Sequence, residues 1–291
     1  MKTNKAGIFL IASIVITGCF FIFSSCKKIK PDPKIPCYLR VENLTLTTNP
    51  LTEGSNSNRI PDVWVTVDGK FIGVFEMPCT FPVIADEGPH TISMNAGILI
   101  NGIAASRGKY PFYAAAEQQV DMLKEKTVTL SPTINYQTNA AFVWMEDFEG
   151  NSFSLEKTSK SENIPIQKIS TGSAFEGSSA FITMTGSQTT FECQTSRDLA
   201  LPKHQEDMYL ELNFKTNVEI HIGLYTTALT SNYQDEVMVL NPTTDWKKIY
   251  IYLSNVAAYH ADGGGKKVYF GCTNSGANTP EIYLDNIKLI Y

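Results

Sequence analysis

The chain has 291 residues, of which 43% are hydrophobic and 18% are charged, and its formal net charge at pH 7 is -5. This acidic balance offers no electrostatic attraction to nucleic-acid phosphates or to an anionic bilayer surface, so neither is expected as a partner. The apolar content excludes global disorder, and the length suits two domains of ordinary size.

The chain opens with the parts of a bacterial export signal. Lys2 and Lys5 give a positive start, and an apolar run occupies residues 6–25. Two cysteines, Cys19 and Cys26, each follow small residues and could accept a lipid anchor. The alternative is an uncleaved transmembrane anchor, since ~20 apolar residues span a bilayer. Both interpretations place the following chain outside the cytoplasm and tethered to a membrane.

The surroundings of the two cysteines favour Cys26 as the lipidation site. Processing takes place at the membrane surface, where the chain should turn polar directly after the modified residue. Cys19 is followed by four large apolar side chains, whereas Cys26 is followed by two lysines. We therefore predict a signal peptide over residues 1–25, a palmitate-type anchor on Cys26 and a tether over residues 26–35.

The sequence around this cysteine also predicts a location. The letters "SSCKK" resemble lipoproteins of the Bacteroidetes group, many of which lie in the outer membrane. Surface-exported members of the group often carry an acidic run soon after the cysteine. The run here, "KKIKPDP", is basic and has Asp32 as its one acidic residue. We expect an outer-membrane lipoprotein that faces the periplasm, with exposure at the cell surface as the alternative.

Four further cysteines are consistent with export: Cys37, Cys79, Cys193 and Cys272. Four cysteines allow three pairings, and a division of the chain near residue 140 leaves two in each half. We expect the disulfides Cys37–Cys79 and Cys193–Cys272, each of which would stabilise its half by ~2–4 kcal/mol in an oxidising compartment. The alternative is four buried free thiols. None of these cysteines has the C-x-x-C spacing of a zinc or redox site.

Residues 36–138 are expected to form a small β-sandwich. The segment 62–78 alternates apolar and polar residues around an Asp68-Gly69 turn, which is the pattern of a β-hairpin. Further strands are predicted in "CYLRVENLTLTT", "DEGPHTISMNAGI" and "KEKTVTLSPTINY". One short stretch, residues 114–123, is the only candidate for a helix in this half.

Part of this half follows a longer pattern, V-x-V-D-G-K-x-x-G…P…G-x-H-T-I. The matching residues are Val65, Val67, Asp68, Gly69, Lys70, Gly73, Pro78, Gly88, His90, Thr91 and Ile92. The pattern resembles the PEGA-like β-sandwich domains of surface and periplasmic proteins. The stretch between Gly73 and Gly88 is longer than that pattern has, so transthyretin-like and immunoglobulin-like sandwiches stay open. Domains of these kinds serve as spacers or interaction modules.

Residues 140–291 are expected to form a β-jelly roll. Short alternating runs rich in β-branched and aromatic residues are separated by Gly, Asn, Pro and Asp, as in antiparallel sandwiches. Four motifs follow one another: "DFEG" at 147–150, "GSSA" at 177–180, "WKKI" at 246–249 and "YLDNI" at 283–287. In this order they resemble the galactose-binding-like jelly rolls that occur as carbohydrate-binding modules.

Asp285 interrupts an otherwise apolar run at the end of the chain. Burying a lone carboxylate is costly unless it is paired or coordinates a cation. In the resembled family the first and last strands lie together, and carboxylates from both often hold a structural calcium ion, which prefers oxygen ligands. The resemblance implies Glu149 and Asp285 as calcium ligands, with Glu146 and Asp147 as weaker candidates. The alternative is an Asp285 that faces outward or bonds to a turn.

Aromatic residues supply the candidate ligand-binding positions. Sugar-binding modules hold the apolar faces of sugars on exposed rings, and nearby amides and carboxylates bind the hydroxyl groups. Tyr225, Tyr233 and Tyr259 lie in loop-like or strand-edge contexts and are our candidates. The alternative for each ring is packing in the core.

The sequence contains no recognisable catalytic motif. The four histidines (His90, His204, His221 and His260) lack the spacing of metal ligands, and the sequence has no G-x-S-x-G, H-E-x-x-H or phosphate-binding glycine loop. A glycosidase pair of carboxylates that are distant in the sequence stays open. We expect a protein that is not an enzyme.

Two functions from different classes follow. The first is a membrane-anchored envelope lipoprotein that binds glycan through its C-terminal jelly roll, with the N-terminal domain as a spacer. The second is a structural or assembly lipoprotein that binds another envelope protein. An exposed aromatic platform would favour the first function, and a broad apolar patch would favour the second.

Overall fold

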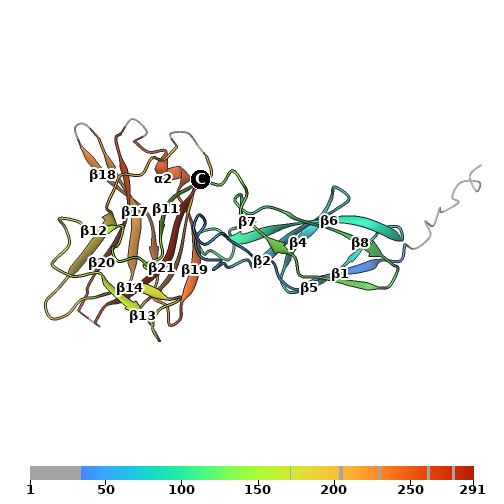
Figure 1. Ribbon diagram of the computed structural model, residues 1–291, viewed down its shortest axis with the longest axis horizontal. Helices are drawn as coiled ribbons and strands as arrows, with labels where there is room; N and C mark the ends of the chain where they lie inside the picture. The colour runs from blue at the N-terminus through green and yellow to red at the C-terminus, as the bar shows by residue number, and fades with distance from the viewer. Residues whose placement is uncertain (1–33, 171, 203–205, 229–230, 261–262, 277–278) are drawn as a thin grey trace, which may run out of the picture. The chain divides into compact units, whose positions relative to one another are not determined.

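A computed structural model of the protein describes residues 34–170, 172–202, 206–228, 231–260, 263–276 and 279–291 (Figure 1). The predicted signal peptide over 1–25, Cys19, Cys26 and most of the tether lie outside these described residues. Among the described residues, no helix has both the length and the apolar character needed to cross a bilayer. Residues Pro36–Tyr291 form one compact unit.

The predicted all-β fold class is confirmed. Every described element is a strand except α2 (Ser254–Ala257), a single helical turn. The strands of the first half are β1 (Cys37–Val41), β2 (Thr45–Leu46), β3 (Asp62–Val67), β4 (Lys70–Glu76), β5 (Cys79–Val83), β6 (Gly88–Leu99), β7 (Arg107–Lys109), β8 (Ala116–Met122), β9 (Thr127–Leu130) and β10 (Thr133–Ile134). Those of the second half are β11 (Phe142–Glu146), β12 (Leu155–Lys157), β13 (Gln167–Ser170), β14 (Ser178–Thr183), β15 (Thr190–Thr195), β16 (Tyr209–Thr216), β17 (Ile220–Thr227), β18 (Asn232–Leu240), β19 (Lys247–Tyr252), β20 (Lys266–Thr273) and β21 (Glu281–Ile290).

The first half forms sheets in the orders β5-β1-β9 and β4-β3-β6-β7, with β8 paired to β6, and a short β10-β2 pair. The predicted hairpin is β3 and β4, which pair antiparallel. Its turn residues Asp68 and Gly69 have φ values of 48° and 77°. Two successive residues with positive φ match the twist of the flanking strands, which explains the Asp-Gly sequence.

The helix considered for residues 114–123 is wrong, because this stretch contains strand β8. β8 pairs antiparallel with β6 from Ala116 opposite Met94 to Met122 opposite Gly88. Ala116 and Met122 are buried while most residues between them are exposed. The long neighbouring strand β6 offers seven backbone partners, and Ala116 and Met122 at the two ends of β8 become buried. Pairing and burial together outweigh the weak preference of this stretch for a helix.

The second half is a sandwich of two antiparallel sheets, which Figure 1 shows as two layers. One sheet has the order β13-β14-β21-β16-β19, with β11 also paired to β21, and the other has the order β12-β15-β20-β17-β18. Alternation along each strand directs one set of side chains into the core, as Val268 and Phe270 of β20 illustrate. The first and last strands of this half, β11 and β21, are neighbours, with Met145 opposite Lys288.

The two halves share a buried core. The cluster built mainly by the first half also contains Tyr209, Tyr250 and Ile290 from the sandwich of the second half. The Tyr113 and Tyr250 hydroxyl groups lie 3.1 Å apart, and Tyr250 also accepts a hydrogen bond from the backbone N–H of Arg59. Residues 36–138 and 140–291 therefore form separate sheets. The second half has a core of its own between its two sheets, and the core of the first half extends onto the second half.

A buried charge network lies at this shared core. The Glu211 carboxylate accepts hydrogen bonds from the hydroxyl groups of Tyr110 at 2.6 Å and Tyr136 at 2.9 Å. Burial by itself would raise the pKa of Glu211, but the ammonium groups of Lys248 and Lys288 outweigh it, and the pKa lies below its ordinary value. The carboxylate is therefore ionised and held between the two halves of the chain.

The predicted disulfides are not formed, since all four cysteines of the described chain are free thiols. On the paired strands β1 and β5, Cys37 lies opposite Val83, whereas Cys79 lies opposite Val41 at the other end of the pair. Four residue steps separate them, or ~13 Å along a strand. Cys193 and Cys272 lie on neighbouring strands but two steps out of register, at the ~7–8 Å of diagonal neighbours, which is too far for a disulfide.

Candidate functional site

The outer face of the sheet β12-β15-β20-β17-β18 carries the candidate site. Because Val268 and Phe270 of β20 face the core, Lys267, Tyr269 and Gly271 lie on the opposite face. Two adjacent hollows lie on this face, with volumes of about 370 and 450 Å³. Together they provide room for a ligand of more than one small ring.

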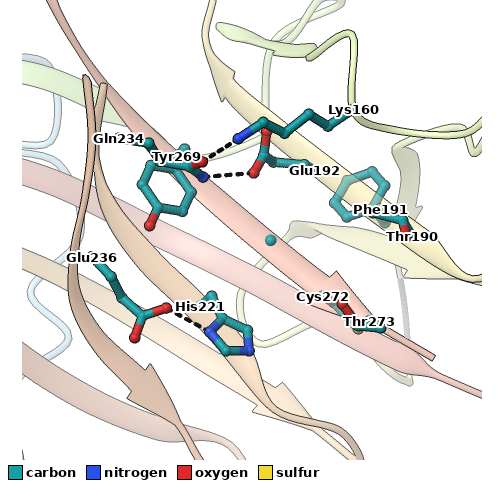
Figure 2. A pocket seen from close by; sticks show the side chains of 11 residues that line it. Lys160, Thr190, Phe191, Glu192, His221, Gln234, Glu236, Tyr269, Cys272 and Thr273 are labelled. Carbon is teal, nitrogen blue, oxygen red and sulfur yellow. Dashed lines mark hydrogen bonds and ion pairs between the residues drawn. The ribbon is translucent and has the colours of Figure 1, made fainter. Parts of the chain in front are cut away.

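The first hollow lies above a glycine. Gly271 is opposite His221 of β17, and the nearest atom to a side chain added at Gly271 would be 3.7 Å away. An added Cβ would therefore make ordinary van der Waals contacts without a clash, and the side chain would extend into the hollow. Figure 2 draws the side chains of the residues that line this hollow, which are Lys160, Thr190, Phe191, Glu192, His221, Gln234, Glu236, Tyr269, Cys272 and Thr273. Two of them, Phe191 and Cys272, have side chains in the core of the sandwich.

Glu192 is the hydrogen-bonding centre of this face. Its Oε1 accepts hydrogen bonds from the hydroxyl groups of Tyr225 and Thr158, both at 2.6 Å, and its Oε2 accepts one from the Gln234 amide at 2.8 Å. Burial, followed by the bond to Glu192, raises the pKa of Tyr225 well above its ordinary value. The tyrosine thus stays a neutral hydrogen-bond donor, and three side chains from separate segments are fixed around one carboxylate.

Tyr269 packs as a second, buried aromatic ring beside this centre. A side chain added at Gly223 would lie 2.6 Å from the Tyr269 ring, so the ring packs directly over the backbone of β17. The Tyr225 and Tyr269 rings have centroids 5.0 Å apart. Burial raises the pKa of Tyr269 to about 12. Both tyrosines are therefore neutral. Tyr225 is partly exposed and offers apolar ring surface together with a hydroxyl group, whereas Tyr269 is buried beneath this surface, with 3% exposure.

Charged side chains at the edges of the face are paired with one another. The His221 Nδ1 lies 2.6 Å from the Glu236 carboxylate, as Figure 2 shows. Beside the second hollow, the Lys267 ammonium lies 2.7 Å from the Glu156 carboxylate, which also accepts a hydrogen bond from the Gln194 amide at 3.0 Å. These pairs leave amide, hydroxyl and aromatic groups as the main groups open to a ligand.

The three tyrosines predicted as ligand-binding residues lie in different places. Tyr225 lines the second hollow. Tyr233 of β18 is opposite the buried Thr226, on the side of the sheet away from the hollows, and stacks on His260 with centroids 3.6 Å apart. Tyr259 follows α2 and is 55% exposed, and it lines neither hollow.

Four residues that sequence reasoning missed complete the face: Lys160, Glu192, Gln234 and Tyr269. The one sequence signal for them was the alternation in "KKVYFGC", which places Tyr269 and Gly271 on the same face as Lys267. The others depend on strand pairing, because the residues that bond to Glu192 come from distant parts of the chain.

Glu149 and Asp285, the two residues predicted to bind calcium, both accept hydrogen bonds from the segment 176–179. Asp285 is buried, and its carboxylate accepts hydrogen bonds from the Ser179 hydroxyl at 2.7 Å and from the Glu176 N–H at 3.2 Å. The Glu149 carboxylate accepts one from the Ser178 N–H at 2.6 Å. It also fills the space next to Gly177, where φ is +40° and an added side chain would lie 2.2 Å from a carboxylate oxygen.

These hydrogen bonds decide how far the two carboxylates fit a calcium ion. Within the described ranges, no three His, Cys, Asp or Glu side chains lie together as metal ligands. Glu149 and Asp285 alone do not make a calcium site, and an ion there would need backbone carbonyl oxygens as well. The predicted calcium site therefore stays a prediction.

Comparison with known proteins gives structural similarities only. No protein-family model matches the sequence, and neither does any curated protein. Similar solved structures include the C-terminal family 22 carbohydrate-binding module of Clostridium thermocellum Xyn10B, with 11% identity and a TM-score of 0.37 over 53% of this chain and 95% of that one. The family 11 module of the cellulosomal cellulase Lic26A-Cel5E from the same organism has 16% identity and a TM-score of 0.38 over 53% and 95%. Likeness at this level does not indicate what the present chain binds.

Proposed function

We propose that this protein is a non-catalytic glycan-binding lipoprotein of the cell envelope, and that the outer face of the sheet β12-β15-β20-β17-β18 binds the glycan. One observation carries the proposal. This face holds the partly exposed Tyr225 ring in one hollow, next to the fixed Glu192–Gln234 pair that borders the other hollow above Gly271. It combines an apolar ring surface with oriented polar groups, which is the combination that a sugar ring requires.

The polar groups of the face match the chemistry of sugar hydroxyl groups, which both donate and accept hydrogen bonds. Tyr225 is partly exposed and Gln234 is exposed, and their hydroxyl and amide groups offer donors and acceptors on this face. The motif resemblance of residues 142–291 to galactose-binding-like jelly rolls supports the same class of ligand. An envelope location would place such a surface where glycans are present.

The anchor and the spacer belong to the same proposal. A lipid on Cys26 would hold the chain at the outer membrane, and the sandwich of residues 36–138 would separate the binding face from the bilayer. The shared core around Tyr110 and Tyr250 supports a stiff spacer, because the two halves are joined by buried contacts as well as by the chain.

A glycosidase is the enzymatic alternative, because Glu192 and Glu236 both line the first hollow. Three donors hold Glu192 as a hydrogen-bond acceptor, and Glu236 pairs with His221. Glycoside hydrolysis needs one carboxyl group that gives its proton to the leaving group. An acceptor held by three donors suits the positioning of neighbouring side chains better than proton transfer.

A second candidate function rests on an aromatic cluster at the other sheet of the sandwich, formed by Tyr283 of β21 and by Phe175 and Trp246 from segments next to strands β14 and β19. Phe175 and Trp246 have ring centroids 5.5 Å apart, and Trp246 lies 6.0 Å from Tyr283. Phe175 is 36% exposed. A cluster of this kind favours a protein partner, as in an assembly lipoprotein, since exposed apolar surface often marks an interface.

A glycan array and calorimetric titration of the purified protein test the proposal. Gly271→Val adds a β-branched side chain where space exists, so it should fill the first hollow and reduce glycan affinity at least tenfold while the melting temperature stays close to that of the wild type. Thr183→Val on β14, in the opposite sheet, is the matched control and should bind as the wild type does. Absence of any glycan binding, or equal binding by Gly271→Val, would contradict the proposal. Hydrolysis of a bound oligosaccharide would instead support the enzymatic alternative.

A further inference from the structure

The two hollows meet at a single hydrogen bond. Lys160 and Gln234 are the residues that line both hollows. The Lys160 ammonium donates to the Gln234 side-chain oxygen and also lies 5.3 Å from the centre of the Tyr225 ring. We call this Lys160–Gln234 hydrogen bond the strap. Because its two residues border both hollows, the strap lies between them; Figure 2 shows this hydrogen bond at the border of the first hollow.

The strap joins opposite edges of the sheet. Lys160 lies in the loop that follows β12, and β12 is one edge of the order β12-β15-β20-β17-β18. Gln234 lies on β18, which is the other edge. The Lys160 side chain therefore crosses the face toward the far edge of the sheet. The strap lies across the middle of the face and not at one end of the strands.

The joined hollows extend along the strands. On β20 they run from Thr273 to Lys267, and on β17 from His221 to Thr227. Six residue steps on each strand correspond to ~20 Å. A groove of this length exceeds one sugar ring and suits a chain of several sugars that lies parallel to the strands.

The charges of the groove indicate a neutral ligand. Three lysines (Lys157, Lys160 and Lys267) are matched by three glutamates (Glu156, Glu192 and Glu236) on or beside the two hollows. The ammonium of Lys267 pairs with a carboxylate, while Lys157 donates to the Asn163 amide oxygen and Lys160 donates to Gln234. A ligand with a negative charge on each sugar would meet no net positive field in this groove.

We infer that the two hollows form one groove for an unbranched, neutral glycan chain, and that the Lys160–Gln234 strap determines the preferred chain length. A short oligosaccharide fits into one hollow while the strap is closed. A longer chain crosses the midpoint and must break the strap, so part of its binding energy is lost. This inference rests on the proposed glycan-binding function.

The test compares chain lengths. The purified protein is titrated with neutral β-1,4-linked gluco-, xylo- and manno-oligosaccharides of two and six units, and with a six-unit oligogalacturonate as the acidic probe. Lys160→Met keeps the length of the side chain but removes the donor. It should raise the ratio of hexasaccharide to disaccharide affinity about 5- to 10-fold, which corresponds to one hydrogen bond that no longer has to break. Lys160→Arg keeps a donor and should keep the wild-type ratio.

The outcomes separate this inference from the function on which it rests. Lys124→Met, an exposed lysine of the first half, is the control and should leave both affinities unchanged. If Gly271→Val removes binding but Lys160→Met leaves the ratio of hexasaccharide to disaccharide affinity unchanged, the role of the strap is overturned. The glycan-binding function is then kept. Tighter binding of the oligogalacturonate than of the neutral chains would overturn the neutral ligand. Absence of binding by the wild type to all probes would overturn both proposals.

Discussion

The Glu211 carboxylate lies 2.9 Å from the Lys248 ammonium, and the two side chains are 0% and 3% exposed. Glu211 and Lys248 come from the neighbouring strands β16 and β19, and the hydroxyl groups that complete the shell of Glu211 come from the first half of the chain. A buried ion pair of this kind contributes little net stability compared with apolar residues, but removing one partner leaves an uncompensated buried charge.

Glu211→Gln should therefore lower the free energy of unfolding by about 3–5 kcal/mol, because Lys248 stays buried without its partner. Replacing both residues, as Glu211→Gln with Lys248→Met, should recover part of this loss. Urea unfolding followed by tryptophan fluorescence measures both. Because the network joins the two halves, the wild type should unfold in one transition. Two separate unfolding transitions in the wild type would contradict the coupling of the two halves. So would a Glu211→Gln variant that is as stable as the wild type.

The fold could be predicted largely from local patterns. The Asp68-Gly69 turn and the alternation around it contain all the information that the β3–β4 hairpin needs. The stretch 114–123 was ambiguous because its composition suits either element, and only its pairing with β6 decides the outcome. The disulfide pairing failed for a related reason, since the strand register that separates Cys37 from Cys79 is not visible in the spacing of cysteines.

Local sequence patterns do not predict which residues form the binding face. The strap joins residues 74 positions apart, and the Tyr225–Glu192 hydrogen bond joins residues 33 positions apart. Tyr225 and Tyr233 are both aromatic residues near strand edges, but Tyr233 of β18 lies opposite Thr226 of β17 and therefore on the other side of the sheet from Tyr225. Which polar residues share a face therefore depends on the order of strands in the sheet, and a single sequence does not contain that order in readable form.

The thiols provide a chemical test of the register. Burial raises the pKa of Cys272 to about 11 and that of Cys193 still further from its ordinary value. Both should resist alkylation by iodoacetamide at pH 8 in the folded protein, since the thiolate is the reactive form. After unfolding without a reductant, peptide mapping should find all four of Cys37, Cys79, Cys193 and Cys272 alkylated. Recovery of a Cys193–Cys272 peptide pair would contradict the free thiols.

The anchor prediction concerns the part of the chain before the β-sandwiches. Cys26→Ala should abolish metabolic labelling with palmitate and release the protein from the membrane fraction. Cys19→Ala should leave the labelling unchanged, because four large apolar residues follow that position and keep it within the bilayer. Labelling that persists in Cys26→Ala and disappears in Cys19→Ala would reverse the assignment.

Asp285 should give the protein a specific pH dependence. Burial raises its pKa from 3.8 to about 6, so the folded protein binds a proton between pH 6 and pH 4 that the unfolded chain does not bind. The contribution of Asp285 to stability therefore increases as the pH falls through this range. Relative to Asp285→Asn, the wild type should gain about 2 kcal/mol between pH 7 and pH 4, measured by urea unfolding in a chelator. If the free energy of unfolding changes equally with pH in the wild type and in Asp285→Asn, the raised pKa of Asp285 is contradicted.

Calcium tests the remaining interpretation of the same residue. A cation that binds only the folded protein stabilises it by RT ln(1 + [L]/Kd), or about 2.7 kcal/mol at a hundred times Kd. If backbone carbonyl groups complete a site with Glu149 and Asp285, the melting temperature should be higher in millimolar calcium than in a chelator. Asp285→Asn and Glu149→Gln should each remove most of this increase, whereas Glu281→Gln, at the start of β21, should keep it. Equal melting temperatures with and without calcium would leave the hydrogen bonds from Ser178 and Ser179 as the partners of the two carboxylates.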